Sequence, residues 1–340
     1  MLSEEDINKI TKEILENSFF KYFSKVKKET RHIILDRFFP TERKVTSITS
    51  GLQTSLGTYW EVLSKRLALE NGFNVECNKT MMMPSKIPSP LSSLINEVKS
   101  EREINGGSLS GFKEALNSIP SSSASSSDVF KPITKGKGVD LIVSRGGEYY
   151  LFDIKTVQVN ANNGNSFNET LINWIAFYKY KYDIDANKIH AFIAFPYNSE
   201  DETNDDSWWE SFGGRVSPLT KEDVLVGNEF WSFLTGNPKA LKIITKGFDE
   251  MSEDHRFIDL YKGIYSCDSP DDLKNFSDLV KLEKINRVYS IKLLNEMEYI
   301  NYRSKMSWQH GSCIFQERIN ELLKFNDYTC PSCGACLRVF

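Results

Sequence analysis

The chain has 340 residues, of which 40% are hydrophobic and 26% are charged, and its formal net charge at pH 7 is -4. This composition excludes a wholly disordered, collagen-like or coiled-coil protein and is typical of one large or two ordinary globular domains. The sequence contains no apolar run long enough to cross a membrane, and its acidic start is unlike a secretion signal, so we expect a cytoplasmic protein. The small negative charge leaves nucleic-acid binding open, because such binding depends on local clusters of basic residues.

The N-terminal part is predicted to be helical. Ile7, Ile10 and Ile14 recur at helical spacing behind Ser3, a residue suited to cap a helix. Apolar residues at the same spacing predict a second helix over residues 51–71.

A short strand is predicted over residues 73–77, and the chain then loses regular patterning between about 78 and 136. Residues 120–128, PSSSASSSD, have no side chains able to build a core, so they predict a mobile loop. Two interpretations of this loop stay open, an inert linker and a segment that orders on a ligand.

Regular patterning returns near residue 138. Two apolar β-rich runs flank Gly146 and Gly147, which predicts an antiparallel hairpin. A helix rich in aromatic core residues and a buried strand follow, so the pattern predicts a mixed α/β core. The predicted elements are strands 139–144 and 149–154, helix 167–183, strand 188–196, and mainly helical stretches over 221–235 and 269–305.

Charged side chains interrupt this hairpin at one end. Asp153 and Lys155 are two residues apart in an apolar strand, so both point to one face of the sheet. Because the two strands are antiparallel, Asp140 is brought to the same end. Carboxylates placed in this way can hold Mg²⁺, and a neighbouring lysine can orient an attacking water and stabilise charge in a transition state. The alternatives are an edge hairpin with solvated charges and a simple salt bridge between Asp153 and Lys155.

The segment GVDLIVSRGGEYYLFDIK, which contains these three residues, resembles the motif of the PD-(D/E)xK nuclease superfamily, with Val139 in place of the usual proline. The resemblance implies an α/β fold with a mixed central sheet flanked by helices, and with added helical N- and C-terminal regions. It implies that Asp140 and Asp153 bind Mg²⁺ and that both act in catalysis with Lys155. A helix ahead of the hairpin often carries a further acid in that superfamily, and Glu61 occupies this place; a solvated helix carboxylate is the alternative.

Three further segments, LFDIKTVQVNANNGNSFNETL, IAFPYN and VGNEFWSFLTG, resemble type II restriction endonucleases of the TdeIII-like group, and the similarity covers about residues 50–240. It implies magnesium-dependent, sequence-specific hydrolysis of phosphodiester bonds in double-stranded DNA at a GGNCC-like palindrome. A palindromic target in turn implies a homodimer, because a two-fold protein matches a two-fold site. The sequence has no GxxxxGKS or GxxxxGKT motif, so we expect no nucleotide cofactor.

An amide-rich segment, residues 156–168, follows Lys155 and is the first candidate for DNA contacts. Asparagine and glutamine can read base edges or bind phosphates, although they are equally common in loops. Basic residues before the hairpin and in its turn are candidates for phosphate contacts, with a solvated basic loop as the alternative. The predicted DNA-binding residues are Gln158, Asn160, Asn162, Asn163, Asn165, Lys135, Lys137 and Arg145.

Four of the six cysteines lie near the C-terminal end. His310 and Cys313 form one pair of metal-ligating residues, and Cys330 and Cys333 form a second, a layout suited to tetrahedral Zn²⁺. Cys336 is the alternative fourth ligand. An iron–sulfur cluster and free thiols remain the other interpretations.

Together these patterns predict four parts: an N-terminal helical region (1–44), a nuclease core (45–240), a helical region (241–305) and a zinc-knuckle tail (306–340). The favoured function is that of a type II restriction endonuclease. Two other functions stay open, a structure-specific DNA repair or recombination nuclease with the same core and a non-catalytic zinc-containing DNA-binding protein.

Overall fold

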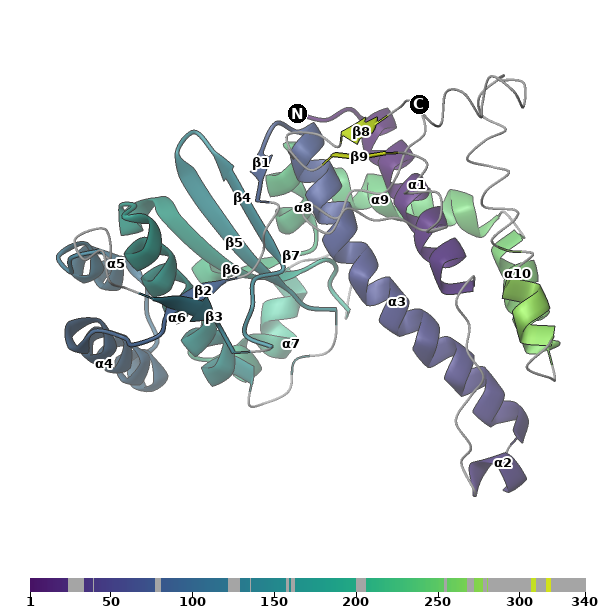
Figure 1. Cartoon of the computed structure of the whole chain (residues 1–340), viewed down its shortest axis with the longest axis horizontal. Helices are drawn as coiled ribbons and strands as arrows, with labels where there is room; N and C mark the ends of the chain where they lie inside the picture. Colours follow the sequence, from purple (N-terminus) through teal and green to yellow (C-terminus); the bar gives the residue numbers. More distant parts are fainter. Residues whose placement is uncertain are drawn as a thin grey trace. The chain divides into compact units, whose positions relative to one another are not determined.

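A computed structural model of the chain (Figure 1) describes residues 1–23, 34–38, 40–76, 81–121, 129–134, 136–156, 159, 163–199, 206–253, 256–267, 272–277, 280, 307–309 and 316–318. These residues form two compact units. The sheet unit consists of residues 1–2 and 67–242, and the helical unit consists of residues 3–66 and 243–340. None of the helices in the described part of the chain combines the length and apolar character that a membrane span requires.

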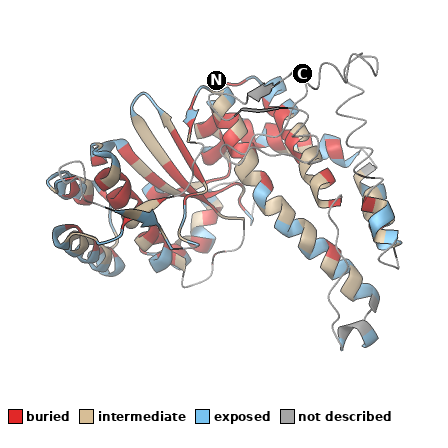
Figure 2. Ribbon diagram, viewed as in Figure 1, coloured by how far each residue is buried: buried red, intermediate tan, exposed pale blue. Residues whose placement is uncertain are grey.

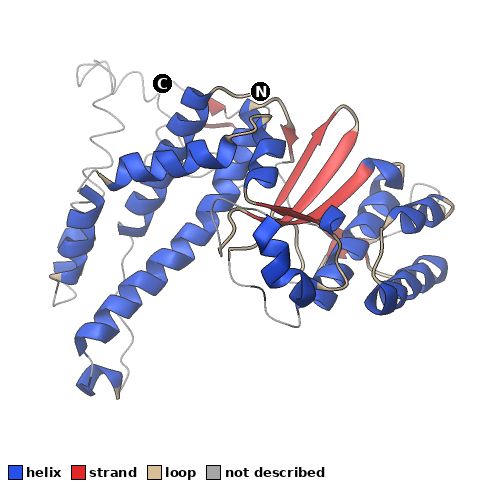
Figure 3. Ribbon diagram, turned by 180° about the vertical axis from the view of Figure 1, so that it is seen from behind, coloured by secondary structure: helices blue, strands red, loops and turns tan. Residues whose placement is uncertain are grey.

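The sheet unit is built on a five-stranded mixed sheet with the order β1-β4-β5-β6-β7 (Figure 3). β1, β4 and β5 pair antiparallel, whereas β5, β6 and β7 pair parallel. The carboxyl ends of the last three strands therefore meet at one edge of the sheet. The strands are β1 (Asn74–Val75), β4 (Leu141–Arg145), β5 (Glu148–Ile154), β6 (Ile189–Phe195) and β7 (Val224–Val226).

The predicted hairpin of β4 and β5 is confirmed, and two glycines form its turn. Gly146 and Gly147 have φ values of 64° and 84°, a backbone conformation that glycine adopts without steric cost. The pairing runs from Arg145 opposite Glu148 to Leu141 opposite Phe152. The first five residues of β5, Glu148 to Phe152, thus each have a paired neighbour on β4.

Helices cover both faces of the sheet, and buried residues lie between the layers (Figure 2). On one face, residues of α6 pack with Ile142, Leu151 and Ile193 in a large apolar core. On the opposite face, Phe230 of α8 packs against Phe152, with ring centroids 5.7 Å apart. The helices of this unit are α4 (Ser89–Asn105), α5 (Ser110–Asn117), α6 (Asn163–Tyr182), α7 (Asp206–Val216) and α8 (Asn228–Thr235), with short turns η2 (Ala186–Lys188) and η3 (Lys221–Asp223).

One of the predicted regions is wrong. The loosely structured region predicted over 78–136 contains α4, α5 and a two-stranded antiparallel sheet of β2 (Met82–Pro84) and β3 (Phe130–Pro132). The serine and proline content of this region favours loops, yet the region contains buried side chains, among them Leu91 and Phe112. The prediction that 221–235 is mainly helical is confirmed by η3 and α8, and β7, the fifth strand of the sheet, lies between them.

Element boundaries also differ from the predicted ones. α6 begins at Asn163 and not at residue 167, so the last part of the amide-rich segment is helical. Its aromatic residues are mainly core residues, as predicted: Trp174, Phe177, Tyr178 and Tyr180 are buried. Most of the serine run (122–128) and most of the stretch 269–305 lie outside the described residues.

The helical unit contains the predicted N-terminal helix, α1 (Glu4–Phe23), which begins where the Ser3 hydroxyl accepts a hydrogen bond from the Asp6 N–H. A core of Phe20, Phe23, Ile48, Ile264 and Val280 holds the unit together. Its other elements are α2 (Leu35–Phe38), α3 (Pro40–Glu70), α9 (Ala240–Ser252), α10 (Arg256–Tyr265), β8 (Ser307–Gln309) and β9 (Gln316–Arg318); the last residues of α3 and the first of α9 belong to the sheet unit.

Candidate active site

Two aspartates face each other where β4 begins and β5 ends. The regular pairing of the two strands ends at Leu141 with Phe152; Asp140 comes directly before Leu141, and Asp153 directly after Phe152. The Asp140 N–H donates to the Phe152 carbonyl and its Oδ2 accepts from the Ile154 N–H, both at 2.9 Å. Asp140 therefore holds the backbone on both sides of Asp153, and the two carboxyl groups are fixed next to each other.

The carboxyl groups lie on the face of the sheet that α6 covers. Asp153 alternates with Leu151 along β5 and pairs with Ile193 of β6, and these two apolar residues belong to the core beneath α6. Asp153 is only 8% exposed. An ionised carboxylate in such surroundings loses hydration and needs a compensating positive charge.

Lys155 supplies one such charge. Its Nζ lies 2.7 Å from Oδ1 of Asp153, and its side chain is 31% exposed whereas that of Asp153 is 11% exposed. The ammonium group thus sits on the solvent side of the carboxylates. The structure brings together Asp140, Asp153 and Lys155, and the salt bridge considered from the sequence is present beside a second carboxylate that it does not neutralise.

Burial raises the pKa of Asp140 to about 6 from its ordinary value of 3.8. The neighbouring Asp153 contributes to this raised pKa, whereas the Ile154 N–H and the Lys155 ammonium oppose it. The raised pKa indicates that the nearby positive charge does not fully compensate the two neighbouring carboxylates. A divalent cation between them would favour the ionised forms of both.

The donor set fits Mg²⁺, which is often held by one or two carboxylates together with waters and substrate phosphates. It does not fit structural Zn²⁺, which takes four side-chain ligands. Within the described ranges, no group of three or more His, Cys, Asp or Glu side chains is placed to hold a metal ion. The predicted zinc ligands lie outside those ranges, at His310, Cys313, Cys330, Cys333 and Cys336.

The first turns of α6 lie close to this end of the hairpin. The Lys137 carbonyl accepts from Trp174 Nε1 and the Lys137 Nζ donates to Ser166 Oγ, both at 2.9 Å. Lys137 is three residues before Asp140, so these bonds connect the approach to Asp140 with α6. At Gly164, an added Cβ would overlap the Ser217 carbonyl, so the helix is in close backbone contact there.

The other predicted DNA-binding residues are distributed differently. Asn165 is exposed and Asn163 is partly buried, both in the first turn of α6. Arg145 lies at the opposite end of the hairpin from the aspartates, where its guanidinium covers the Phe73 ring at 4.0 Å. Gln158, Asn160, Asn162 and Lys135 lie outside the described residues.

Glu61 belongs to the helical unit, on α3. The carboxylates of the candidate site lie in the sheet unit, so the part of Glu61 in the site stays a prediction.

A buried polar cluster, not predicted from the sequence, borders the same region. Arg102 is 2% exposed and donates to the Asn168 side chain, the Asp223 carboxylate and the Gly107 carbonyl. Asp223 immediately precedes Val224, which lies in one row with Ile193 and Asp153 across the sheet. The cluster joins α4, α6 and the start of β7. Arg102 lies in a helix of ordinary polar composition, so no sequence pattern distinguishes it.

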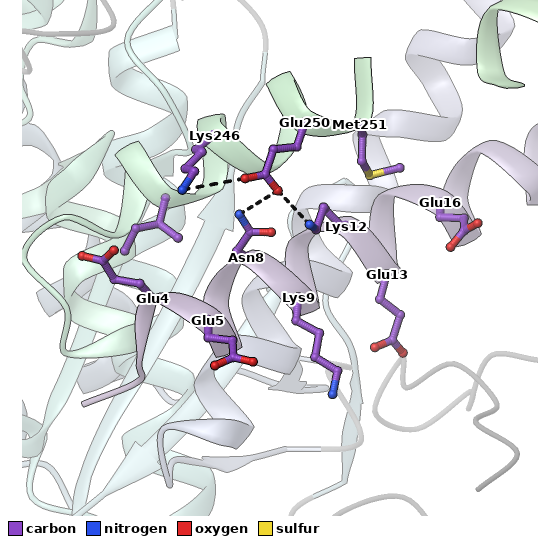
Figure 4. A pocket seen from close by; sticks show the side chains of 11 residues that line it. Glu4, Glu5, Asn8, Lys9, Lys12, Glu13, Glu16, Lys246, Glu250 and Met251 are labelled. Carbon is purple, nitrogen blue, oxygen red and sulfur yellow. Dashed lines mark hydrogen bonds and ion pairs between the residues drawn. The ribbon is translucent and has the colours of Figure 1, made fainter. Parts of the chain in front are cut away.

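A groove of about 900 Å³ lies elsewhere, between α1 and α9 of the helical unit (Figure 4). Its lining is charged and includes the ion pair of Lys12 with Glu250 at 2.7 Å. None of the predicted site residues lines it. The candidate active site is therefore identified by its chemistry, a carboxylate pair with an ammonium group.

Comparison with known families gives one match. The family described as "Type II restriction endonuclease, HinfI" matches residues 3–252, which is most of the chain. This agrees with the restriction endonuclease expected from the sequence but does not support the TdeIII-like group. No curated protein and no solved structure matches the chain.

Proposed function

Because the chain belongs to the HinfI family of type II restriction endonucleases, we propose that it hydrolyses double-stranded DNA at a specific short sequence with Asp140, Asp153 and Lys155 at the cleavage site. The observation that supports this site is the pair of facing carboxylates with the Lys155 ammonium 2.7 Å from one of them. Phosphodiester hydrolysis needs a cation, an oriented water and a charge opposite the developing negative charge. In this proposal the carboxylates hold the cation and Lys155 orients the water and supplies the opposite charge, as the resemblance to PD-(D/E)xK nucleases implies.

Asp140 and Asp153 would hold Mg²⁺ through their carboxylate oxygens. When bound, the ion supplies a positive charge to the phosphate and lowers the pKa of a bound water. Lys155 lies on the solvent side of Asp153, where its ammonium can orient the attacking water and stabilise charge on the phosphate oxygens. Glu61 is proposed as an assisting carboxylate.

The proposal includes a palindromic target, a homodimer that reads it, and action in the cytoplasm. A two-fold dimer presents one active site to each strand of a palindromic duplex. Asn163 and the exposed Asn165 in the first turn of α6, with the amide-rich segment before it, are the proposed reading elements. GGNCC, which follows from the TdeIII-like resemblance alone, is one sequence to test.

The test is digestion of a long DNA of known sequence by the full chain, followed by sequencing of the fragment ends. With Mg²⁺ we expect discrete fragments whose ends share one short sequence. EDTA, Ca²⁺ and the Asp153→Asn variant are the controls, and each should leave the DNA intact. Ends without a common sequence, or cutting confined to branched DNA, would contradict the proposal and support a repair nuclease.

A further inference from the structure

We propose that Tyr197 is a positioning residue for Lys155, and this inference rests on the proposed function. Tyr197 lies just beyond β6, and its hydroxyl donates a hydrogen bond of 3.2 Å to the Thr156 carbonyl. Thr156 follows Lys155 directly. The tyrosine thus holds the chain immediately after the residue whose ammonium group must be placed accurately.

Lys155 lies where the regular pairing of β5 ends. β5 stops at Ile154, and beyond it the Lys155 N–H donates to the Ala194 carbonyl at 2.9 Å. The bond from Tyr197 is the next attachment along the chain, again to the continuation of β6. Two successive residues are therefore held to β6 and its extension after the strand itself has ended.

The anchor of Tyr197 is itself well fixed. The Pro196 carbonyl accepts a hydrogen bond of 2.7 Å from Nε1 of Trp231, a fully buried residue of α8. The preceding residue, Phe195, accepts from the Gly227 N–H at 2.8 Å. Through Tyr197, Thr156 is therefore held to the end of β6, which is itself fixed to α8.

Lys155 needs such support more than the aspartates do. Asp140 is bonded to the backbone on both sides of Asp153 and Asp153 belongs to β5, whereas Lys155 has a long flexible side chain and a backbone beyond the last β5 residue. A displacement of about 1 Å at a catalytic group can cost about a hundredfold in rate. A single net hydrogen bond is worth about a three- to tenfold factor, so loss of the hydroxyl should give a partial defect.

The experiment compares Tyr197→Phe with a matched variant, Tyr22→Phe. Tyr22 also donates its hydroxyl to a backbone carbonyl, that of Ile48 at 2.7 Å, but in the helical unit. For each variant we would measure kcat, KM for target DNA, the Mg²⁺ concentration giving half-maximal rate, and the thermal midpoint. We expect Tyr197→Phe to lower kcat about three- to tenfold while KM and the Mg²⁺ requirement stay unchanged. Tyr22→Phe should leave kcat unchanged.

Several outcomes would overturn the inference. An unchanged kcat in Tyr197→Phe would show that the bond does not support Lys155. A raised KM would assign Tyr197 to DNA contact, a changed Mg²⁺ requirement would assign it to the metal site, and a much lower thermal midpoint would assign it to general stability. If the wild-type chain cleaves no DNA, the proposed function fails and the inference falls with it, whereas normal wild-type cleavage with a normal variant removes the inference alone.

Discussion

The Asp140 carboxylate accepts a hydrogen bond of 2.9 Å from the Ile154 N–H, directly after Asp153 on the neighbouring strand. Asp140 therefore contributes in two ways, as an acceptor that fixes the end of β5 and as a negative charge beside a second carboxylate. Asparagine at this position would keep an acceptor oxygen and remove the charge. The two contributions can thus be separated by one substitution.

Asp140→Asn should make the metal-free protein more stable at pH 8. Burial raises the folded-state pKa of Asp140 to about 6, above its ordinary value of 3.8, so its ionisation destabilises the fold as pH rises from about 4 to 6 and beyond. The gain at pH 8 should be on the order of 1 to 3 kcal/mol, and it should vanish below pH 4. Chemical unfolding in EDTA at the two pH values measures it.

Asp185→Asn serves as the control of opposite sign. The Asn187 N–H and then the Asn117 side chain lower the pKa of Asp185, so its ionised form stabilises the fold above pH 4 and this contribution is lost as pH falls. The Asp185 variant should be less stable than wild type at pH 8. Equal and pH-independent effects in the two variants would show that the Asp140 pKa is not raised.

Lys155→Ala and Asp153→Asn should each lower the cleavage rate by about a hundredfold or more, because Lys155 supplies a positive charge at the reacting phosphate and Asp153 would hold the Mg²⁺. Specific DNA binding in Ca²⁺ should persist, since neither change touches the proposed reading elements. Cleavage is measured by nicking of supercoiled plasmid and binding by fluorescence anisotropy. Wild-type cleavage in either variant would refute the assignment of the active site, and the exposed Lys221→Ala is the neutral control.

Arg102→Ala should destabilise the protein by about 3 to 5 kcal/mol, because it leaves the buried Asp223 carboxylate without its partner. Lys12→Ala removes an ion pair of similar length between exposed groups and should change stability far less. Urea unfolding of both variants gives the comparison. Similar small losses of unfolding free energy in both variants would mean that the buried cluster around Arg102 stabilises the fold no more than the exposed ion pair does.

Alanine at Gln158, Asn160, Asn162, Asn163 and Asn165 together should weaken or relax the site preference. A lost base contact typically costs about 1 to 3 kcal/mol of discrimination. The assay is cleavage of a panel of sites that each carry one mismatch. If discrimination is unchanged, another element reads the DNA, and Arg145 or Arg215 would be tested next.

Protein purified without chelators should contain about one zinc per chain, from four ligands among His310, Cys313, Cys330, Cys333 and Cys336. Metal analysis measures the content, and visible absorption would identify an iron–sulfur cluster instead. Absence of metal together with six freely titrating thiols in the native protein would exclude both sites.

The hairpin and its charged end could be predicted because local signals agree there. Two adjacent glycines, apolar runs on both sides and charges at one end all specify the same antiparallel pairing, and antiparallel pairing then brings Asp140 to Asp153. The sheet beyond the hairpin was harder to predict. β7 has three residues, too few to show a period, and it is recognised only by its pairing with β6.

Long-range contacts were not predictable from local pattern. Arg102 meets Asp223 across 121 positions of sequence, and Tyr197 meets Thr156 across 41. Asn168 resembled the rest of the amide-rich segment, yet it is fully buried and bonded to Arg102. The side chains of the candidate site were thus easier to predict than the buried contacts around them, because those contacts depend on tertiary neighbours.

The contact at Gly164 limits how this enzyme could be redirected to new DNA sequences. The position leaves no room for a side chain, because the Ser217 backbone occupies the space where a Cβ would stand. A mutant library across the proposed reading segment that varied residue 164 would therefore lose members through misfolding, and such losses would be mistaken for failed recognition. Keeping glycine there while varying Asn163 and Asn165 would separate specificity from folding.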